Sequence, residues 1–148
     1  DGNNVSMSLA IASAMAGMKM TLAAPKGFEF SSEFFKGLSK RYPRHDVHQM
    51  HSAKEAVKTA DIVYTDVWAS MGQEDDAVRR MKAFADFQVN EELMQAAPRD
   101  ARFMHDLPAN RGLEVTDGVM DGSQSVVFQQ AENRMHLARG LFAWILGR

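Results

Sequence analysis

Ionisable side chains stand where two apolar segments of this sequence end. His105 and Asp106 follow the run ARFM at 101–104, and Asp66 follows the β-branched and aromatic run IVYT at 62–65. A carboxylate in such a place can pair with an ammonium group or accept a proton from an attacking amine. Taken singly, each aspartate is equally typical of a turn cap, and His105 of a hydrogen-bonded core histidine. The functional interpretation therefore depends on whether one edge of the fold carries all of them.

Other segments add groups that bind anions. The polar turn DGNN at 1–4 presents Asn4 and backbone amides just before a helical pattern, and a helix N-terminus attracts anions. The turn lacks the G-x-G-x-x-G fingerprint of dinucleotide sites. After Asp66, Ser70 offers a hydroxyl and Met71 a backbone amide. Arg134 carries a planar guanidinium that suits phosphate, and Glu132 either orients it or forms a plain surface ion pair.

Alternating helices and strands position these groups. Periodicity predicts helices at 5–18, 31–42, 52–60, 75–84, 90–97 and 129–146, and strands at 18–25, 46–51, 61–68, 101–107 and 125–128. Ser31 or Ser32 and Ser52 are expected to cap the second and third helices. The order predicts an α/β fold, a doubly wound parallel sheet flanked by helices, which is Rossmann-like.

The carboxyl ends of such strands form the edge where α/β sheets bind ligands. The turn at 1–4, Asp66 and the pair His105–Asp106 all fall at this edge, which favours one shared cleft over three separate caps. No strand precedes the turn at 1–4 in this sequence. We therefore expect the first strand of the sheet to lie upstream of Asp1.

Composition bounds the class of protein. The chain has 148 residues, which fits one domain, and a formal net charge of −2, which gives no electrostatic basis for binding nucleic acid. Cysteine is absent, so disulfides and thiolate chemistry are excluded. No apolar run reaches the roughly 18–20 residues that a bilayer requires. We expect a cytoplasmic protein without nucleic-acid or membrane partners.

Three histidines imitate a metal site. His45, His48 and His51 are spaced by three, and residues three apart on a strand point to opposite faces. His45 and His51 would lie about 20 Å apart on an extended strand, too far to share one ion. We therefore expect no metal.

Four motifs in this order resemble the ornithine carbamoyltransferases: DGNN (1–4), TDVWASMG (65–72), HDLP (105–108) and AENRMH (131–136). AAPKGFEF (23–30) and QVNEELM (88–94) are also similar to family sequence. The resemblance covers nearly all of the chain but only the second, amino-acid-binding domain of the family. We see no S-T-R-T-type loop or H-P-x-Q motif of the first, carbamoyl-phosphate domain, which we therefore expect upstream.

The resemblance implies transfer of a carbamoyl group from carbamoyl phosphate to the δ-amine of ornithine, without metal or organic cofactor. It implies that Asn4 and the Ser70–Met71 segment hold the amino acid's carboxylate and amino ends. Asp66 would pair with an ammonium group, and Arg134 would touch the carbamoyl carbonyl. The carbamoyl group and the amine would meet at Asp106–Leu107, with His105 as an orienting neighbour. The full-length protein would be a homotrimer or a multiple of it, and the isolated chain inactive.

Asp106 departs from the family, which usually has cysteine there. An aspartate beside the amine can accept its proton, or hold the amine as an unreactive ammonium. If Asp106 lies near Asp66, repulsion should raise at least one of the two pKa values. Two alternatives stay open: a related carbamoyltransferase for another amine, and a non-catalytic amino-acid-binding module.

Overall fold

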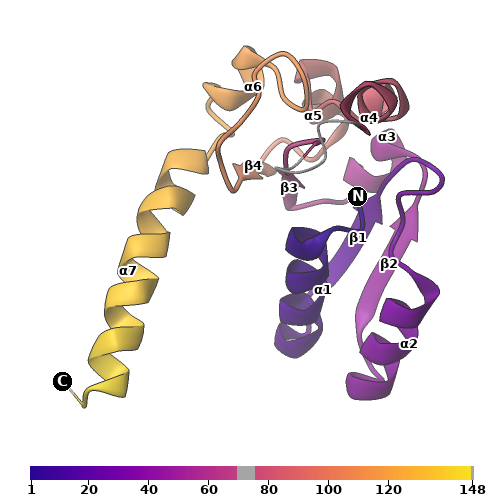
Figure 1. Cartoon of the computed structure of the whole chain (residues 1–148). Coiled ribbons are helices and arrows are strands. Elements are labelled where there is room, and N and C mark those ends of the chain that lie inside the picture. Colours follow the sequence, from indigo (N-terminus) through magenta and orange to yellow (C-terminus); the bar gives the residue numbers. More distant parts are fainter. Residues whose placement is uncertain (70–75, 148) are drawn as a thin grey trace.

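Helices and parallel strands alternate along most of the chain (Figure 1). The computed structural model describes residues 1–69 and 76–147. The strands are β1 (Lys19–Ala23), β2 (Asp46–Met50), β3 (Ile62–Thr65) and β4 (Arg102–His105). The helices are α1 (Asn4–Ala16), α2 (Ser32–Arg41), α3 (Ala53–Val57), α4 (Ala77–Phe84), α5 (Glu91–Ala96), α6 (Asp117–Met120) and α7 (Val127–Ile145), with a 3₁₀ turn at Ala85–Phe87.

The strands pair in two parallel ladders. Lys19 of β1 stands opposite Asp46 of β2, and Ile62 of β3 stands opposite Arg102 of β4. A parallel pair requires a crossover, and α2 makes the first crossover. The predicted α/β class with parallel strands and flanking helices is confirmed. Within the described residues no pairing joins the two ladders, so the sheet is present as two two-stranded parts. The strand expected upstream of Asp1 stays a prediction.

Each ladder has its own hydrophobic cluster. The cluster on β1 and β2 includes Ala10 of α1, Leu38 of α2 and Phe30, all buried. The cluster on β3 and β4 is centred on Phe103 and Val127, which are fully buried. The helices are thus held mainly by burial of their apolar faces, and the polar strand ends are left at the margins of these clusters.

Short polar residues set several helix starts. Ser31 caps α2 by accepting a hydrogen bond from the Phe34 N–H, and Ser52 caps α3 in the same way from Glu55. Both predicted capping sites are confirmed. Gly17, with φ of 68°, ends α1 in the left-handed conformation, which a residue without a side chain adopts at little cost.

The predicted strand at 125–128 is wrong. Ser125 makes a single parallel bridge to Phe103, and the next residues turn into α7, which begins at Val127. A short apolar run such as SVVF does not distinguish a buried strand from a buried helix start. The side chain of Val127 reaches the core from the helix. The short helix α6 is an element that the sequence patterns do not predict.

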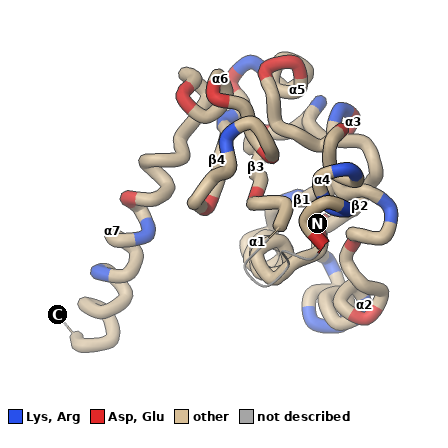
Figure 2. The backbone as a smooth tube through the Cα atoms, turned by 45° about the horizontal axis from the view of Figure 1, so that its top comes forward, with Lys and Arg blue, Asp and Glu red and all other residues tan. Residues whose placement is uncertain are grey.

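Helix α7 extends away from the other elements (Figure 1). Large apolar side chains along this helix are exposed, and Trp144 is 79% exposed. Charged residues are sparse along this helix (Figure 2). Among the described residues, no helix combines the length and apolar character needed to cross a membrane.

Candidate active site

The ends of β3 and β4 bring two carboxylates together. Thr65 pairs with His105 in the parallel ladder, so the residues that follow them, Asp66 and Asp106, leave the sheet side by side. These aspartates are 40 residues apart in sequence and belong to the edge that the sequence predicts as the ligand-binding edge. This arrangement can bind a cation or exchange a proton with one.

The surroundings of Asp106 raise the pKa of its carboxyl group. Burial raises the pKa of the Asp106 carboxyl, and the negative charge of Asp66 raises it further. A backbone hydrogen bond and the nearby His105 lower this pKa in part. The predicted rise in at least one pKa of this pair is confirmed. Asp106 is therefore closer to neutral pH as a proton acceptor than an ordinary aspartate.

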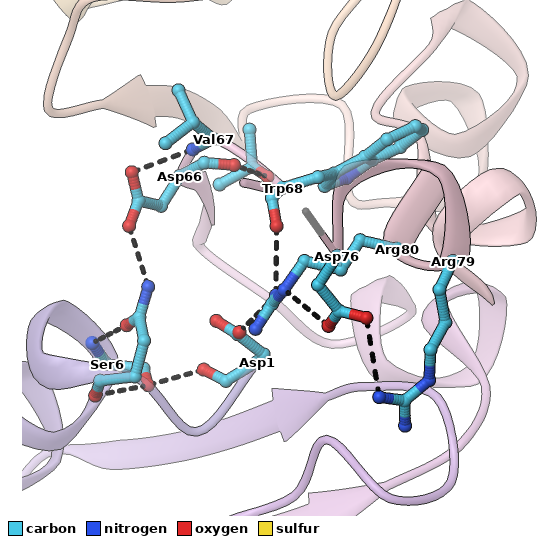
Figure 3. Close-up of polar contacts among 10 residues, drawn as sticks. Asp1, Ser6, Asp66, Val67, Trp68, Asp76, Arg79 and Arg80 are labelled. Atoms are coloured by element: carbon cyan, nitrogen blue, oxygen red, sulfur yellow. Dashed lines mark hydrogen bonds and ion pairs between the residues drawn. The ribbon is translucent and has the colours of Figure 1, made fainter. Parts of the chain in front are cut away.

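Asp66 is held in a fixed orientation by the turn at 1–4. The Asn3 side chain donates a hydrogen bond of 2.8 Å to Asp66 Oδ2, and the Val67 N–H donates one of 2.7 Å to Oδ1 (Figure 3). Asn3 also caps α1, since its Oδ1 accepts from the Ser6 N–H. Asn4, the predicted ligand, is the first residue of α1 and is exposed beside this contact. Two adjacent asparagines look alike in sequence, so their separate roles emerge only from these contacts.

A buried arginine ties the same turn to the end of β3. Arg80 Nη1 donates to Asp1 Oδ2 at 2.7 Å and to the Trp68 carbonyl at 2.9 Å (Figure 3). Its guanidinium also lies over the rings of Phe28 and Phe84. Sequence reasoning missed Arg80, because an arginine in an amphipathic helix is normally a solvated residue.

Arg134 of α7 lines the same pocket as Asp106. Asp106, Leu107, Pro108 and Arg134 line one pocket, together with Ala109, Arg111, Met120, Phe128, Ala131 and Met135. Tyr64 lies close to these charges. Its pKa is raised to about 12 by burial and by Asp106 and Asp66, and lowered in part by the Gln130 hydrogen bond and by Arg134. The pocket thus combines the cationic side chain of Arg134 with Asp106, one of the two carboxylates.

His105 lies behind the pocket wall and is 1% exposed. Its Nδ1 accepts the Leu107 N–H at 2.9 Å, and its Nε2 faces Glu114 Oε1 at 3.3 Å. Its backbone N–H donates to Gln130 Oε1, and Gln130 Nε2 donates to the Tyr64 hydroxyl. Glu114 and Gln130 were not among the predicted residues, because nothing in their local sequence marks them.

Several predicted site residues have other partners in the structure or lie outside the described residues. Glu132 faces His136 at 3.4 Å, so it is not the partner expected for Arg134. Ser70 and Met71 lie outside the described residues. The three histidines of the metal-like spacing have separate partners, namely Ser39 for His45, Asp46 for His48 and the Ala24 carbonyl for His51. The described part of the chain holds no cluster of three or more metal-binding side chains.

Parallel strands with polar carboxyl ends, flanked by helices, define a Rossmann-like domain, a class in which small molecules bind at this edge of the sheet. The model of the Asp/Orn-binding domain of aspartate/ornithine carbamoyltransferase matches residues 1–145. The chain belongs to this family.

Individual proteins that are similar to this chain are ornithine carbamoyltransferases. The catabolic ornithine carbamoyltransferase of Thermoplasma acidophilum is 47% identical over 148 residues, which cover 99% of this chain and 48% of that protein. The ornithine carbamoyltransferase structure from Pyrococcus furiosus is 46% identical, with a TM-score of 0.88 over 97% of this chain and 46% of that one. The anabolic enzyme of Campylobacter jejuni is 32% identical, with a TM-score of 0.90 over 99% and 49%. The chain spans about half the length of the relatives it matches.

Proposed function

We propose that this chain is the ornithine-binding domain of a carbamoyltransferase. The full-length protein would transfer a carbamoyl group from carbamoyl phosphate to the δ-amine of ornithine, giving citrulline and phosphate. The observation that carries the proposal is the pairing of Thr65 with His105, which sets Asp66 and Asp106 side by side next to the pocket of Arg134. The relatives named ornithine carbamoyltransferase support the choice of substrates.

The amino acid is recognised by its two charged ends. Asp66, with both oxygens already oriented by N–H donors, offers its charge to an ammonium group. Asn4 stands at the N-terminus of α1, where the helix dipole favours a carboxylate. The resemblance assigns Ser70 and Met71 to the same ends of the substrate. Ornithine would therefore lie across the turn at 1–4 and the end of β3.

The reaction needs a cation and a proton acceptor at the carbonyl carbon. The amine nitrogen attacks this carbon, and the Arg134 guanidinium stabilises the oxyanion that forms. Asp106 accepts the proton that the amine loses, and its raised pKa makes it a stronger base than an ordinary aspartate. The carbon–oxygen bond to phosphate then breaks. The Leu107 carbonyl, on the same pocket wall, is the acceptor that we assign to the carbamoyl amide.

A carbamoyltransferase for another amine is the second candidate. Asp106 favours it, because a second carboxylate beside Asp66 changes the charge and shape of the amine site relative to the usual cysteine. A non-catalytic module that binds an amino acid is the third possibility, and the presence of Arg134 in the pocket argues against it.

The test is citrulline formation by the full-length protein with ornithine, compared with a panel of other amines at equal concentration. Ornithine should give the highest kcat/KM, and the 148-residue chain alone should be inactive. A higher kcat/KM with another amine would establish the second candidate. Binding of ornithine without turnover by the full-length protein would establish the third. Asp106→Cys separates an impaired enzyme, which it would activate, from one that uses the aspartate, which it would slow.

The remaining features of the proposal concern the whole protein. Citrulline production fits arginine biosynthesis, the role implied by the anabolic relatives from Pyrococcus furiosus and Campylobacter jejuni. We also propose a cytoplasmic homotrimer or a multiple of it. Light scattering of the full-length protein would measure the assembly, and a monomeric mass would contradict it.

A further inference from the structure

A buried ionisable pair lies behind the pocket wall. Glu114 has no exposed surface and His105 has 1%. Glu114 Oε1 stands 3.3 Å from His105 Nε2 and also accepts the Asn110 N–H. Glu114 thereby connects the end of β4 to the loop that follows it. Neither the proposed substrate contacts nor the hydrophobic core accounts for a glutamate in this position.

The hydrogen bonds of His105 fix its tautomer. The Leu107 N–H donates to Nδ1 at 2.9 Å, so Nδ1 presents a lone pair and carries no hydrogen. The ring hydrogen is therefore on Nε2, where it is donated to Glu114 Oε1. The partner of one ring nitrogen thus determines the state of the other, as in the oriented histidines of many active sites.

This tautomer has consequences for Leu107. Its N–H is directed to the imidazole, and its φ of 60° is unusual for a residue with a branched side chain. Such a conformation persists when its surroundings enforce it. The Leu107 carbonyl accepts no hydrogen bond from any residue that the structure describes. The carbonyl is thus available to a ligand in the pocket that Leu107 lines.

In the same tautomer, His105 donates no hydrogen bond to Asp106. Asp106 Oδ1 lies 3.5 Å from His105 Nδ1 and has no hydrogen-bond partner among the described residues, although the atom is buried. A hydrogen on Nδ1 would be donated to Asp106 and would also oppose the Leu107 N–H. With the hydrogen on Nε2, the ring donates nothing to Asp106 Oδ1, and the Asp106 carboxyl is not tied to His105.

We propose that Glu114 is a positioning residue for carbamoyl transfer: it holds His105 in the Nε2–H tautomer. The ring then accepts the Leu107 N–H and does not bind the Asp106 carboxyl, which leaves the Leu107 carbonyl and Asp106 available on the pocket wall. The inference rests on the proposed function for its kinetic part only. Glu114 does not touch the substrate and acts through His105 and the loop at 106–110.

Two substitutions separate positioning from charge. Glu114→Gln retains an oxygen that accepts from His105 Nε2 and from Asn110, and it should keep kcat within about 3-fold of the wild type, because the acceptor geometry survives. Glu114→Met has a similar length without an acceptor, and it should lower kcat by about 100-fold, the effect of a small misplacement of reacting groups. The KM for ornithine should change less than kcat. Val115→Ala, a fully buried neighbour without a role in this network, is the control that lowers stability and leaves kcat unchanged.

The ring state of His105 gives a readout independent of turnover. In ¹⁵N NMR spectra of the full-length protein, His105 should be a neutral imidazole protonated at Nε2 in the wild type and in Glu114→Gln. Glu114→Met should shift the signals toward protonation at Nδ1. A wild-type ring that is charged or protonated at Nδ1 overturns the proposal without any variant.

The kcat values of the two Glu114 variants test the proposal as well. The proposal is overturned if Glu114→Met keeps the wild-type kcat, or if Glu114→Gln loses as much as Glu114→Met. Absence of citrulline formation by the wild type would refute the proposed function instead. The NMR comparison would then still decide whether Glu114 sets the tautomer.

Discussion

The Asn3 side chain donates a hydrogen bond of 2.8 Å to Asp66, which lies 63 residues further along the chain. Asn3 precedes α1, in the part of the fold built on β1 and β2, whereas Asp66 ends β3 in the other ladder. One side chain therefore caps a helix and orients a carboxylate of the candidate site. Helix capping and the orientation of this carboxylate therefore depend on the same side chain.

Asn3→Ala should lower the free energy of unfolding by about 2 kcal/mol, since it removes a helix cap and leaves Asp66 Oδ2 without its donor. Ser31→Ala removes only the cap of α2 and should cost about 1 kcal/mol. Urea denaturation of both variants measures the difference. Equal losses would show that the Asp66 contact contributes nothing to stability.

Asp106 should make stability decrease as the pH rises. Its pKa in the folded protein is raised above the ordinary 3.8, so the folded state binds the proton more tightly than the unfolded state. The stability that Asp106 contributes is then greatest below pH 3.8 and is lost as the pH rises through the raised value. Asp106→Asn should remove this loss, and the variant should be more stable than the wild type at neutral pH.

Asp121 is the matched control for this pH effect. Hydrogen bonds from Arg111 lower its pKa, so the stability it contributes should be lost as the pH falls. Asp121→Asn should therefore change the pH profile with the opposite sign. Urea denaturation between pH 3 and 7 measures both profiles. A profile of Asp106→Asn identical to that of the wild type would contradict the assigned pKa direction.

Two adjacent arginines should differ greatly in their effect on stability. Arg80→Ala leaves the Asp1 carboxylate, 12% exposed, without its partner and should cost about 3–5 kcal/mol. Arg79 is 69% exposed and pairs only with nearby Asp76, so Arg79→Ala should cost at most about 1 kcal/mol. Thermal denaturation of the two variants provides the comparison. Similar losses would indicate that the buried ion pair is not a stabilising contact between the turn at 1–4 and the end of β3.

Arg134→Ala should reduce kcat for citrulline formation by about 10²–10³-fold in the full-length protein, if its guanidinium stabilises the oxyanion. The unfolding free energy should hardly change, because the side chain is exposed on α7. Arg139→Ala, also exposed on α7, is the control that should retain activity. Unchanged kcat in Arg134→Ala would remove Arg134 from the reaction while leaving the ornithine contacts untouched.

Much of the architecture follows from local sequence. Period-3.6 and period-2 patterns predict most helices and strands, because each element is stabilised mainly by burying one of its faces. Ser31, Ser52 and Gly17 mark element ends through hydrogen bonds or backbone freedom within a few residues. The prediction for 125–128 is wrong because so short a run carries no period, and backbone pairing of Ser125 and Val126 with Phe103 ends where α7 begins.

The sequence by itself determined that Asp66 and Asp106 follow strands in an α/β chain, and that Asp106 stands where the family has cysteine. Only the tertiary structure decided that Thr65 pairs with His105, which makes these carboxylates neighbours. Tertiary packing likewise decided the burial of Asp106, which raises its pKa together with the charge of Asp66. It also decided that Asn3 orients Asp66 and that Glu114 faces His105. The physical reason is range: caps and periodicity act within a few residues, whereas charge coupling and buried hydrogen bonds depend on which distant segments pack together.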